Sequence, residues 1–174
     1  NITSLPWTVD FEDMTAGTIP ACWDNSGSST STISGTSPHY VWGVYNYGDN
    51  NMIRMYNYYV QSGSALINSI PITIPDDGTI YDLKFDYSNH SNSGDMLVKV
   101  STDDGATFTT IGSYSNLTGS TDRENPGSFS NAEIYLSDYA GETIILQFFN
   151  MANYGSGAIY VDNITICAAP SCLA

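Results

Sequence analysis

Apolar and polar positions alternate most clearly on two arms within residues 96–111, MLVKVSTDDGATFTTI. The arms are rich in β-branched and aromatic residues, and the Asp104-Gly105 pair lies between them. A period of two residues is typical of a strand with one buried face, and an Asp-Gly pair between two such runs is typical of a hairpin turn. The pattern therefore predicts a two-strand hairpin with a well-defined register.

The same alternation predicts strands along the rest of the chain. Residues 79–87 alternate strictly, so we expect a packed set made of Ile80, Leu83, Phe85 and Tyr87. The apolar run at residues 143–149 suits a central strand. Pro71 and Pro75 place the segment 71–75 at a sheet edge or outside the sheet, because proline has no N–H to donate. The other predicted strands are residues 7–12, 52–56, 65–70, 133–136 and 158–166.

Two long segments, residues 24–38 and 114–130, show no such period and are rich in small and polar residues, which predicts loops. No stretch places apolar residues three and four apart over a dozen positions, so we expect no substantial helix. About nine or ten short strands separated by turns predict an all-β fold, an antiparallel β-sandwich.

Charge and composition narrow the function. The chain has 174 residues, the size of one domain, and carries a formal net charge of −14 from 18 acidic and 4 basic residues. So acidic a surface repels nucleic acid and anionic membranes, and it suits cation binding or an extracellular location. A hydrophobic content of 41% argues against a disordered acidic chain. No run of about 20 apolar residues is present, so we expect no membrane insertion.

The chain begins at Asn1 without a basic or apolar leader, so we interpret it as a mature or trimmed fragment. Its three cysteines are Cys22, Cys167 and Cys172. An odd number leaves one thiol free or paired outside the chain. A bridge between Cys167 and Cys172, or between Cys22 and either of them, is compatible with the sequence.

Three motifs follow one another along nearly the whole chain. They are Asp10-Phe11-Glu12 followed by Pro20-Ala21-Cys22-Trp23, LSDYAGETIILQF at residues 136–148, and IYVDNITI at residues 159–166. Together they resemble the jelly-roll modules of the MAM and cleaved-adhesin group, the latter known from bacterial surface proteases and adhesins. The MAM cysteine framework is missing, which favours the bacterial branch. The resemblance implies a jelly-roll β-sandwich over residues 1–167, with residues 168–174 as a linker into a following domain.

The resemblance also implies a metal site. In such modules the first and last strands lie side by side and share a structural calcium ion with loop carbonyls. Carried over by position, this marks Glu12 and Asp162 as calcium ligands, with Asp24 and Asp49 as further candidates. Calcium takes six to eight oxygen ligands and organises loops that lack regular hydrogen bonding, which suits the irregular segment 24–38. The alternative is that Glu12 and Asp162 are ordinary outward-facing residues.

The hairpin turn has the pattern S-x-D-x-G-x-T-F of the Asp box, which occurs in several copies on sialidase propellers. This chain has one copy and only two arginines. We interpret Asp103 as a residue that accepts backbone N–H groups across the turn and Gly105 as one that supplies a positive φ. Motifs for a zinc hydrolase or a nucleophilic serine are missing, so we expect no enzyme activity.

An aromatic tract at residues 40–59 is the candidate ligand site. Tyrosine and tryptophan rings have flat apolar faces and a polar edge, which suits stacking on sugars or contact with proteins. Alternation in a strand predicts that Trp42 and Tyr56 are buried. The remaining candidates for ligand binding are Tyr45, Tyr47, Tyr58 and Tyr59.

The combined prediction is a secreted or cell-surface, non-catalytic adhesion module of a larger protein, stabilised by structural calcium. Its ligand is a host or matrix protein, bound through loops and exposed tyrosines. The alternative is a carbohydrate-binding module attached to a secreted hydrolase, with tyrosines stacking on a glycan.

Overall fold

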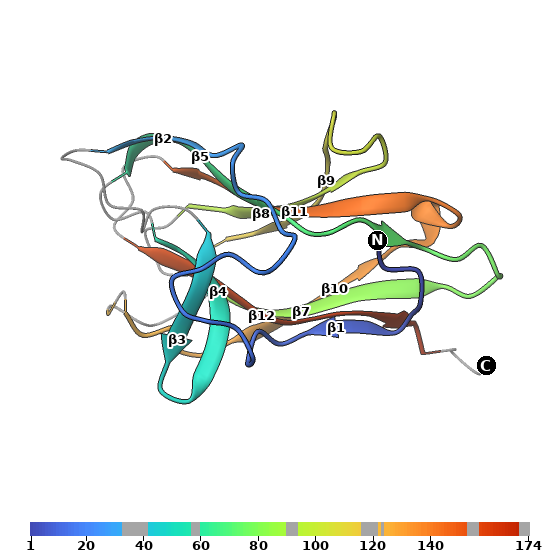
Figure 1. The fold of residues 1–174 in the computed structure, drawn as a ribbon, viewed down its shortest axis with the longest axis horizontal. Helices are drawn as coiled ribbons and strands as arrows, with labels where there is room; N and C mark the ends of the chain where they lie inside the picture. The colour runs from blue at the N-terminus through green and yellow to red at the C-terminus, as the bar shows by residue number, and fades with distance from the viewer. Residues whose placement is uncertain are drawn as a thin grey trace.

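Two antiparallel sheets of six strands each lie face to face (Figure 1). The computed structural model describes residues 1–32, 42–56, 60–89, 94–115, 122, 124–152 and 157–170. These residues form twelve strands and one short 3-10 helix, η2 (Ser137–Tyr139). The structure confirms the all-β antiparallel sandwich, with two or three strands more than predicted.

The first sheet has the strand order β10-β7-β12-β4-β3, and β1 also pairs with β12. Residues 158–161 of β12 pair with β4, while residues 164–166 pair with β1, so the first and last strands lie side by side as the resemblance implied. The strands of this sheet are β1 (Trp7–Val9), β3 (Gly43–Tyr47), β4 (Asn50–Tyr56), β7 (Tyr81–Asn89), β10 (Ser130–Tyr135) and β12 (Ala158–Ala168).

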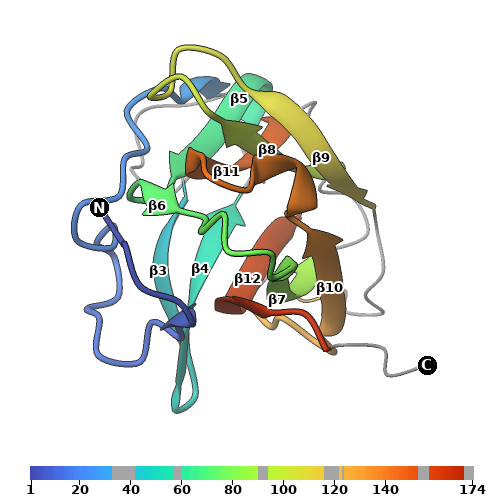
Figure 2. The ribbon, with the colours of Figure 1, turned by 90° about the vertical axis from the view of Figure 1, so that its right-hand side faces the viewer.

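The second sheet has the order β2-β5-β11-β8-β9, and β6 pairs with the beginning of β11 (Figure 2). The apolar strand β11 lies between β5 and β8, which confirms the central position expected for residues 143–149. The strands of this sheet are β2 (Ser29–Thr32), β5 (Val60–Asn68), β6 (Ile72–Thr73), β8 (Met96–Ser101), β9 (Thr109–Tyr114) and β11 (Thr143–Ala152).

Three large aromatic side chains join the two sheets in the core. Phe85 of β7 and Phe148 of β11 meet edge to face with ring centroids 5.5 Å apart, and Trp42 lies 6.1 Å from Phe148. Trp42 is completely buried, as predicted, and its indole N–H donates to the carbonyl of Ala65 in the second sheet. Each such side chain contributes roughly 1.5–3 kcal/mol by its burial.

The structure corrects two expectations about elements and contains one strand, β3, that was not predicted. Ile80 is 53% exposed rather than packed, because β7 begins one residue later, at Tyr81. The alternation of residues 83, 85 and 87 toward the core is confirmed. The predicted loop 24–38 contains β2, and residues 43–47 form the separate strand β3. Both strands are short and pair at sheet edges, where the burial pattern is weak.

The predicted hairpin is present as β8 and β9, with Met96 opposite Tyr114 and Val100 opposite Thr109. Its turn is held by Asp103, whose Oδ1 accepts from the backbone N–H of Thr107 at 2.8 Å and whose Oδ2 accepts from the Thr107 hydroxyl at 2.6 Å. Gly105 has φ 88°, a conformation that favours glycine. The acidic turn is therefore built as a local structural device.

Two further expectations concern the whole chain. Cys22 and Cys167 are both free thiols, so the bridge between them is not formed, and Cys172 lies outside the described residues. No helix in the described part of the chain is long and apolar enough to cross a membrane.

We predict that Asp103→Asn lowers the melting temperature at neutral pH. Hydrogen bonds from Thr107 and Ser101 lower the pKa of Asp103 to about 2, below the roughly 3.9 of an unfolded chain. The ionised carboxylate therefore stabilises the fold above about pH 4, and this contribution is lost as the pH falls toward 2. The difference between variant and wild type should shrink over that range, as measured by thermal unfolding.

The neighbouring Asp104→Asn is the matched control, because Asp104 is also exposed in the turn. Its melting temperature should stay close to that of the wild type. Equal melting temperatures for Asp103→Asn and the wild type at pH 7 would contradict the structural role of Asp103.

Candidate functional site

Two acidic residues from distant parts of the chain come together beside β4. Glu12 follows β1, and Asp162 lies in β12 with a side chain only 4% exposed. The backbone N–H of Asn51 donates to Glu12 Oε1 at 3.2 Å, and the Asn50 amide donates to Asp162 Oδ2 at 2.9 Å. The two adjacent asparagines thus connect the two carboxylates.

Burial raises the pKa of Asp162, and the nearby negative charges of Glu12 and Asp86 raise it further. Hydrogen bonds from Asn50 and from the N–H of Asn163 act in the opposite direction. Within the described residues, no lysine or arginine forms a salt bridge with Asp162. A buried carboxylate near other negative charges is electrostatically costly, and a cation bound there would offset this cost.

The donor set suits a hard cation only in part. In the described ranges of the chain, no three acidic, histidine or cysteine side chains are grouped closely enough to hold a metal ion. Glu12 and Asp162 would supply two carboxylates, and backbone carbonyls or waters would supply the remaining oxygen ligands that calcium needs. The neighbouring carbonyls of Glu12 and Met14 accept from the Asn51 amide.

Asp24 and Asp49 have different surroundings. Asp24 pairs with Asn68 as an isolated bridge, and its Oδ1 accepts from the N–H of Ser26 at 2.9 Å. Hydrogen bonds from Ser26 lower the pKa of Asp24, so its carboxylate already supports a local turn. Asp49 is exposed in the turn between β3 and β4, immediately before Asn50. Their roles as metal ligands remain predictions.

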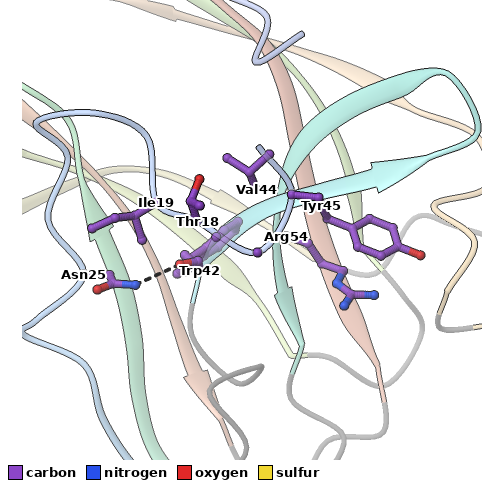
Figure 3. Close-up of a pocket in the computed structure, with 10 residues that line it drawn as sticks. Thr18, Ile19, Asn25, Trp42, Val44, Tyr45 and Arg54 are labelled. Carbon is purple, nitrogen blue, oxygen red and sulfur yellow. Dashed lines mark hydrogen bonds between the residues drawn. The ribbon is translucent and has the colours of Figure 1, made fainter. Parts of the chain in front are cut away.

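Tyr45 lies on the outer face of the first sheet, where it is half-buried among charged and aromatic neighbours (Figure 3). The Arg54 guanidinium carbon lies 3.6 Å from the centre of the Tyr45 ring, and the Tyr160 ring lies 5.9 Å away. The Tyr45 hydroxyl donates to the carbonyl of Glu124 at 2.7 Å. Burial and Glu124 raise the pKa of Tyr45 to about 12, and one face of the ring is occupied by Arg54.

A groove of about 600 Å³ lies beside Tyr45, between residues 16–19 and β3 (Figure 3). Val44 exchanges backbone hydrogen bonds with Gly17 and Thr18, so the loop covers the edge of β3. A Cβ at Gly43 would lie 3.2 Å from the carbonyl oxygen of Thr18, so a larger residue there would require the loop to shift by a few tenths of an ångström. Asn25 donates to the carbonyl of Trp42 and closes one end of the groove.

The other tyrosines of the aromatic tract differ in exposure. Tyr47 is 42% exposed at the end of β3, whereas Tyr56, which was expected to be buried, is half-buried with its ring 4.9 Å from the guanidinium carbon of Arg54. Tyr58 and Tyr59 lie outside the described residues. The roles of these tyrosines in ligand binding stay predictions.

The sequence did not indicate the ion pair that organises this surface. Arg54 Nη1 lies 2.8 Å from Glu124 Oε2 although the two residues are 70 positions apart in the chain. With only four basic residues, Arg54 was a rare cation and so a candidate for pairing, but nothing in the local sequence identifies its partner. The same holds for Asn50 and Asn51, which begin β4 directly after a polar turn.

No family model and no curated protein matches this sequence. The fold is similar to a cleaved adhesin domain of Lys-gingipain from Porphyromonas gingivalis, with TM-score 0.61, 15% identity, and coverage of 95% of this chain and 99% of that one. The fold is that of the cleaved adhesin domains. It is also similar to the carbohydrate-binding module TmCBM61 in complex with β-1,4-galactotriose, with TM-score 0.56, 13% identity, and coverage of 92% and 94%.

A third similar structure is a variant of the family 29 carbohydrate-binding module CBM29-2 complexed with cellulohexaose. Its TM-score is 0.51 at 13% identity, with coverage of 94% of this chain and 91% of that one. Each of these three structures is named as an adhesin domain or a carbohydrate-binding module. The similarity in fold agrees with the expected resemblance to cleaved adhesins.

We predict that Glu124→Gln destabilises the fold by about 0.5–1 kcal/mol, because it removes the charge that pairs with the largely buried Arg54 while Glu124 itself is partly exposed. Urea unfolding measures the change. Glu142→Gln, an exposed glutamate before β11, is the control and should leave the free energy of unfolding unchanged. Equal losses in the two variants would contradict a specific role for the Arg54–Glu124 pair.

Proposed function

We propose that the chain is a non-catalytic binding module of a larger secreted or cell-surface protein and that its ligand is a glycan bound on the outer face of the first sheet. The observation that carries this proposal is the character of that face. It presents exposed tyrosines, Tyr47 and Tyr135, among amide and charged side chains. Rings surrounded by hydrogen-bonding groups suit sugars, which have both apolar ring faces and hydroxyls.

The distribution of exposed apolar groups supports a glycan over a large protein interface. Five large apolar side chains are exposed among the described residues, and they come from separate segments of the chain: Ile19, Tyr47, Ile80, Tyr135 and Met151. Stable protein interfaces have a contiguous apolar centre. Adhesion to a host or matrix protein is the second candidate, and the likeness to a cleaved adhesin domain favours it.

We further propose that Glu12 and Asp162 hold a structural calcium ion. The support is the buried Asp162 carboxylate next to the charge of Glu12, joined through Asn50 and Asn51. The ion would tie the segment after β1 to β12 and to the β3–β4 hairpin. Asp49 immediately precedes Asn50, the residue that donates to Asp162, and is a further candidate ligand.

Added calcium should raise the melting temperature of the wild-type chain, because an ion that binds only the folded state stabilises it by mass action. EDTA should reverse the shift. Asp162→Asn and Glu12→Gln should abolish the response to calcium, whereas Asp24→Asn tests whether the Asp24 carboxylate contributes. A wild-type transition that is the same in EDTA and in millimolar calcium would rule out the calcium site.

A glycan array and an array of extracellular matrix proteins, both probed with the whole chain, test the proposed ligand class. We expect binding to oligosaccharides on the first array and none on the second. Binding only to matrix proteins would replace the glycan proposal with the adhesion candidate. A Tyr47→Ala variant on the same arrays reports whether the β3 edge takes part.

A further inference from the structure

The outer face of β10, β7 and β12 carries a second cavity, about 430 Å³ in volume, toward the β10 edge of the first sheet, whereas Tyr45 lies on β3 at the opposite edge. Strand pairing places outward-facing residues in rows across this face. Asn131 lies opposite Asp86, Glu133 opposite Lys84, and Tyr135 opposite Asp82. Nothing in the sequence suggested that these residues meet.

Asp86 orients two asparagine side chains at the wall of this cavity. The Asn131 amide nitrogen donates to Asp86 Oδ1, and the Asn163 amide nitrogen donates to Asp86 Oδ2 at 2.9 Å. Because the carboxylate takes an N–H from each amide, both amide oxygens are left as acceptors, and no described residue donates to either. Asn163 has φ 50° at a β-bulge, a conformation that asparagine tolerates better than most residues.

Lys84 supplies a hydrogen-bond donor in the same cavity. Its Nζ lies 3.2 Å from Glu133 Oε1 and 3.6 Å from Oδ2 of the completely buried Asp82. The two carboxylates hold the ammonium group in place, and an ammonium has three N–H donors. The cavity thus has two acceptors, the amide oxygens of Asn131 and Asn163, and one donor, Lys84 Nζ. Hydrogen bonds and ion pairs already hold all three side chains in position.

Tyr135 continues the row of outward-facing residues to the end of β10. Residues 131, 133 and 135 share one face of the strand, and Tyr135 is 64% exposed. At roughly 3.3 Å per residue, the row from Asn131 to Tyr135 spans about 13 Å. A chain-like ligand lying along β10 would therefore contact an aromatic ring and a set of hydrogen-bonding groups in succession.

The chemistry of this row selects one ligand class. Hydroxyl groups both donate and accept, so they match amide oxygens, carboxylates and an ammonium at the same time. A sugar ring also offers C–H groups that stack on a tyrosine face. The carboxylates of Asp86 and Glu133, on a chain of net charge −14, would repel uronic or sialic acids.

We propose that the row Asn131–Glu133–Tyr135, with Lys84, Asp86 and Asn163, binds a neutral oligosaccharide along β10, with the Tyr135 ring as its stacking platform. This inference rests on the proposed glycan-binding function and locates it at one edge of the first sheet. Tyr47, the exposed tyrosine of β3, lies at the opposite edge and marks the competing location for the glycan. Met151, which is 60% exposed on β11 of the second sheet, serves as the control.

The test is calorimetric titration of the folded chain with neutral β-1,4-linked oligosaccharides of glucose, galactose and mannose, and with oligogalacturonate as the acidic probe. We expect binding to at least one neutral probe and not to oligogalacturonate. Tyr135→Ala should weaken this binding about tenfold through the lost stacking surface, and Asn131→Ala should weaken it several-fold. Met151→Ala should bind like the wild type.

Other outcomes overturn the inference in distinguishable ways. Loss of binding in Tyr47→Ala with normal binding in Tyr135→Ala and Asn131→Ala would refute this site and leave glycan binding intact. Preference for oligogalacturonate would refute the neutral ligand class. Failure of the wild type to bind any probe of the panel would count against the inference and the glycan function together. Circular dichroism and thermal unfolding check that each variant is folded. If Tyr135→Ala does not fold, the binding of Asn131→Ala decides whether the ligand lies along β10.

Discussion

The last strand, β12, is the constraint on which the rest of the first sheet depends. It pairs with β7 along most of its length, and on its other side with β4 and then with β1. Its register with β7 shifts at a β-bulge between Asp162 and Thr165. A bulge adds one residue on one strand only. The side chains of β12 at the bulge therefore no longer alternate regularly between the two faces of the sheet. Both Asp162 and Asn163, the centres of the two candidate sites, lie at this bulge.

The chain has only four basic residues, and the basic residues described in the first sheet are paired with carboxylates. Among the described residues, Arg54 pairs with Glu124 and Lys84 with Asp82 and Glu133. Lys99 lies in the second sheet, with its Nζ 3.7 Å from the centre of the Phe149 ring, and burial lowers its pKa. The cations of the first sheet are thus held by carboxylates at fixed positions. The outer face of that sheet therefore presents ordered polar groups rather than mobile charges.

Local patterns were sufficient to predict the elements with strong alternation. Residues 96–100, 83–87 and 143–149 are strands, and residues 83, 85 and 87 face the core as expected. The turn at Asp103 is the structural device that its residues indicated. The prediction was wrong where tertiary pairing, not local pattern, decides the structure. Residues 29–32 form a strand only because β5 provides a partner, and Ile80 is exposed because β7 begins after it.

The sequence alone determined which residues prefer strands and turns and which face of each strand is apolar, because these properties depend on neighbours two to four positions away. The contacts that make the candidate sites were decided by the tertiary structure. Asn50 and Asp162 are 112 positions apart, and Asp86 and Asn163 are 77 apart. Alternation fixes the side of a strand on which a residue lies, but strand order and register fix its partner across the sheet. Only the packed sandwich therefore brings Glu12 to Asp162, and Asn131 and Asn163 to the same carboxylate.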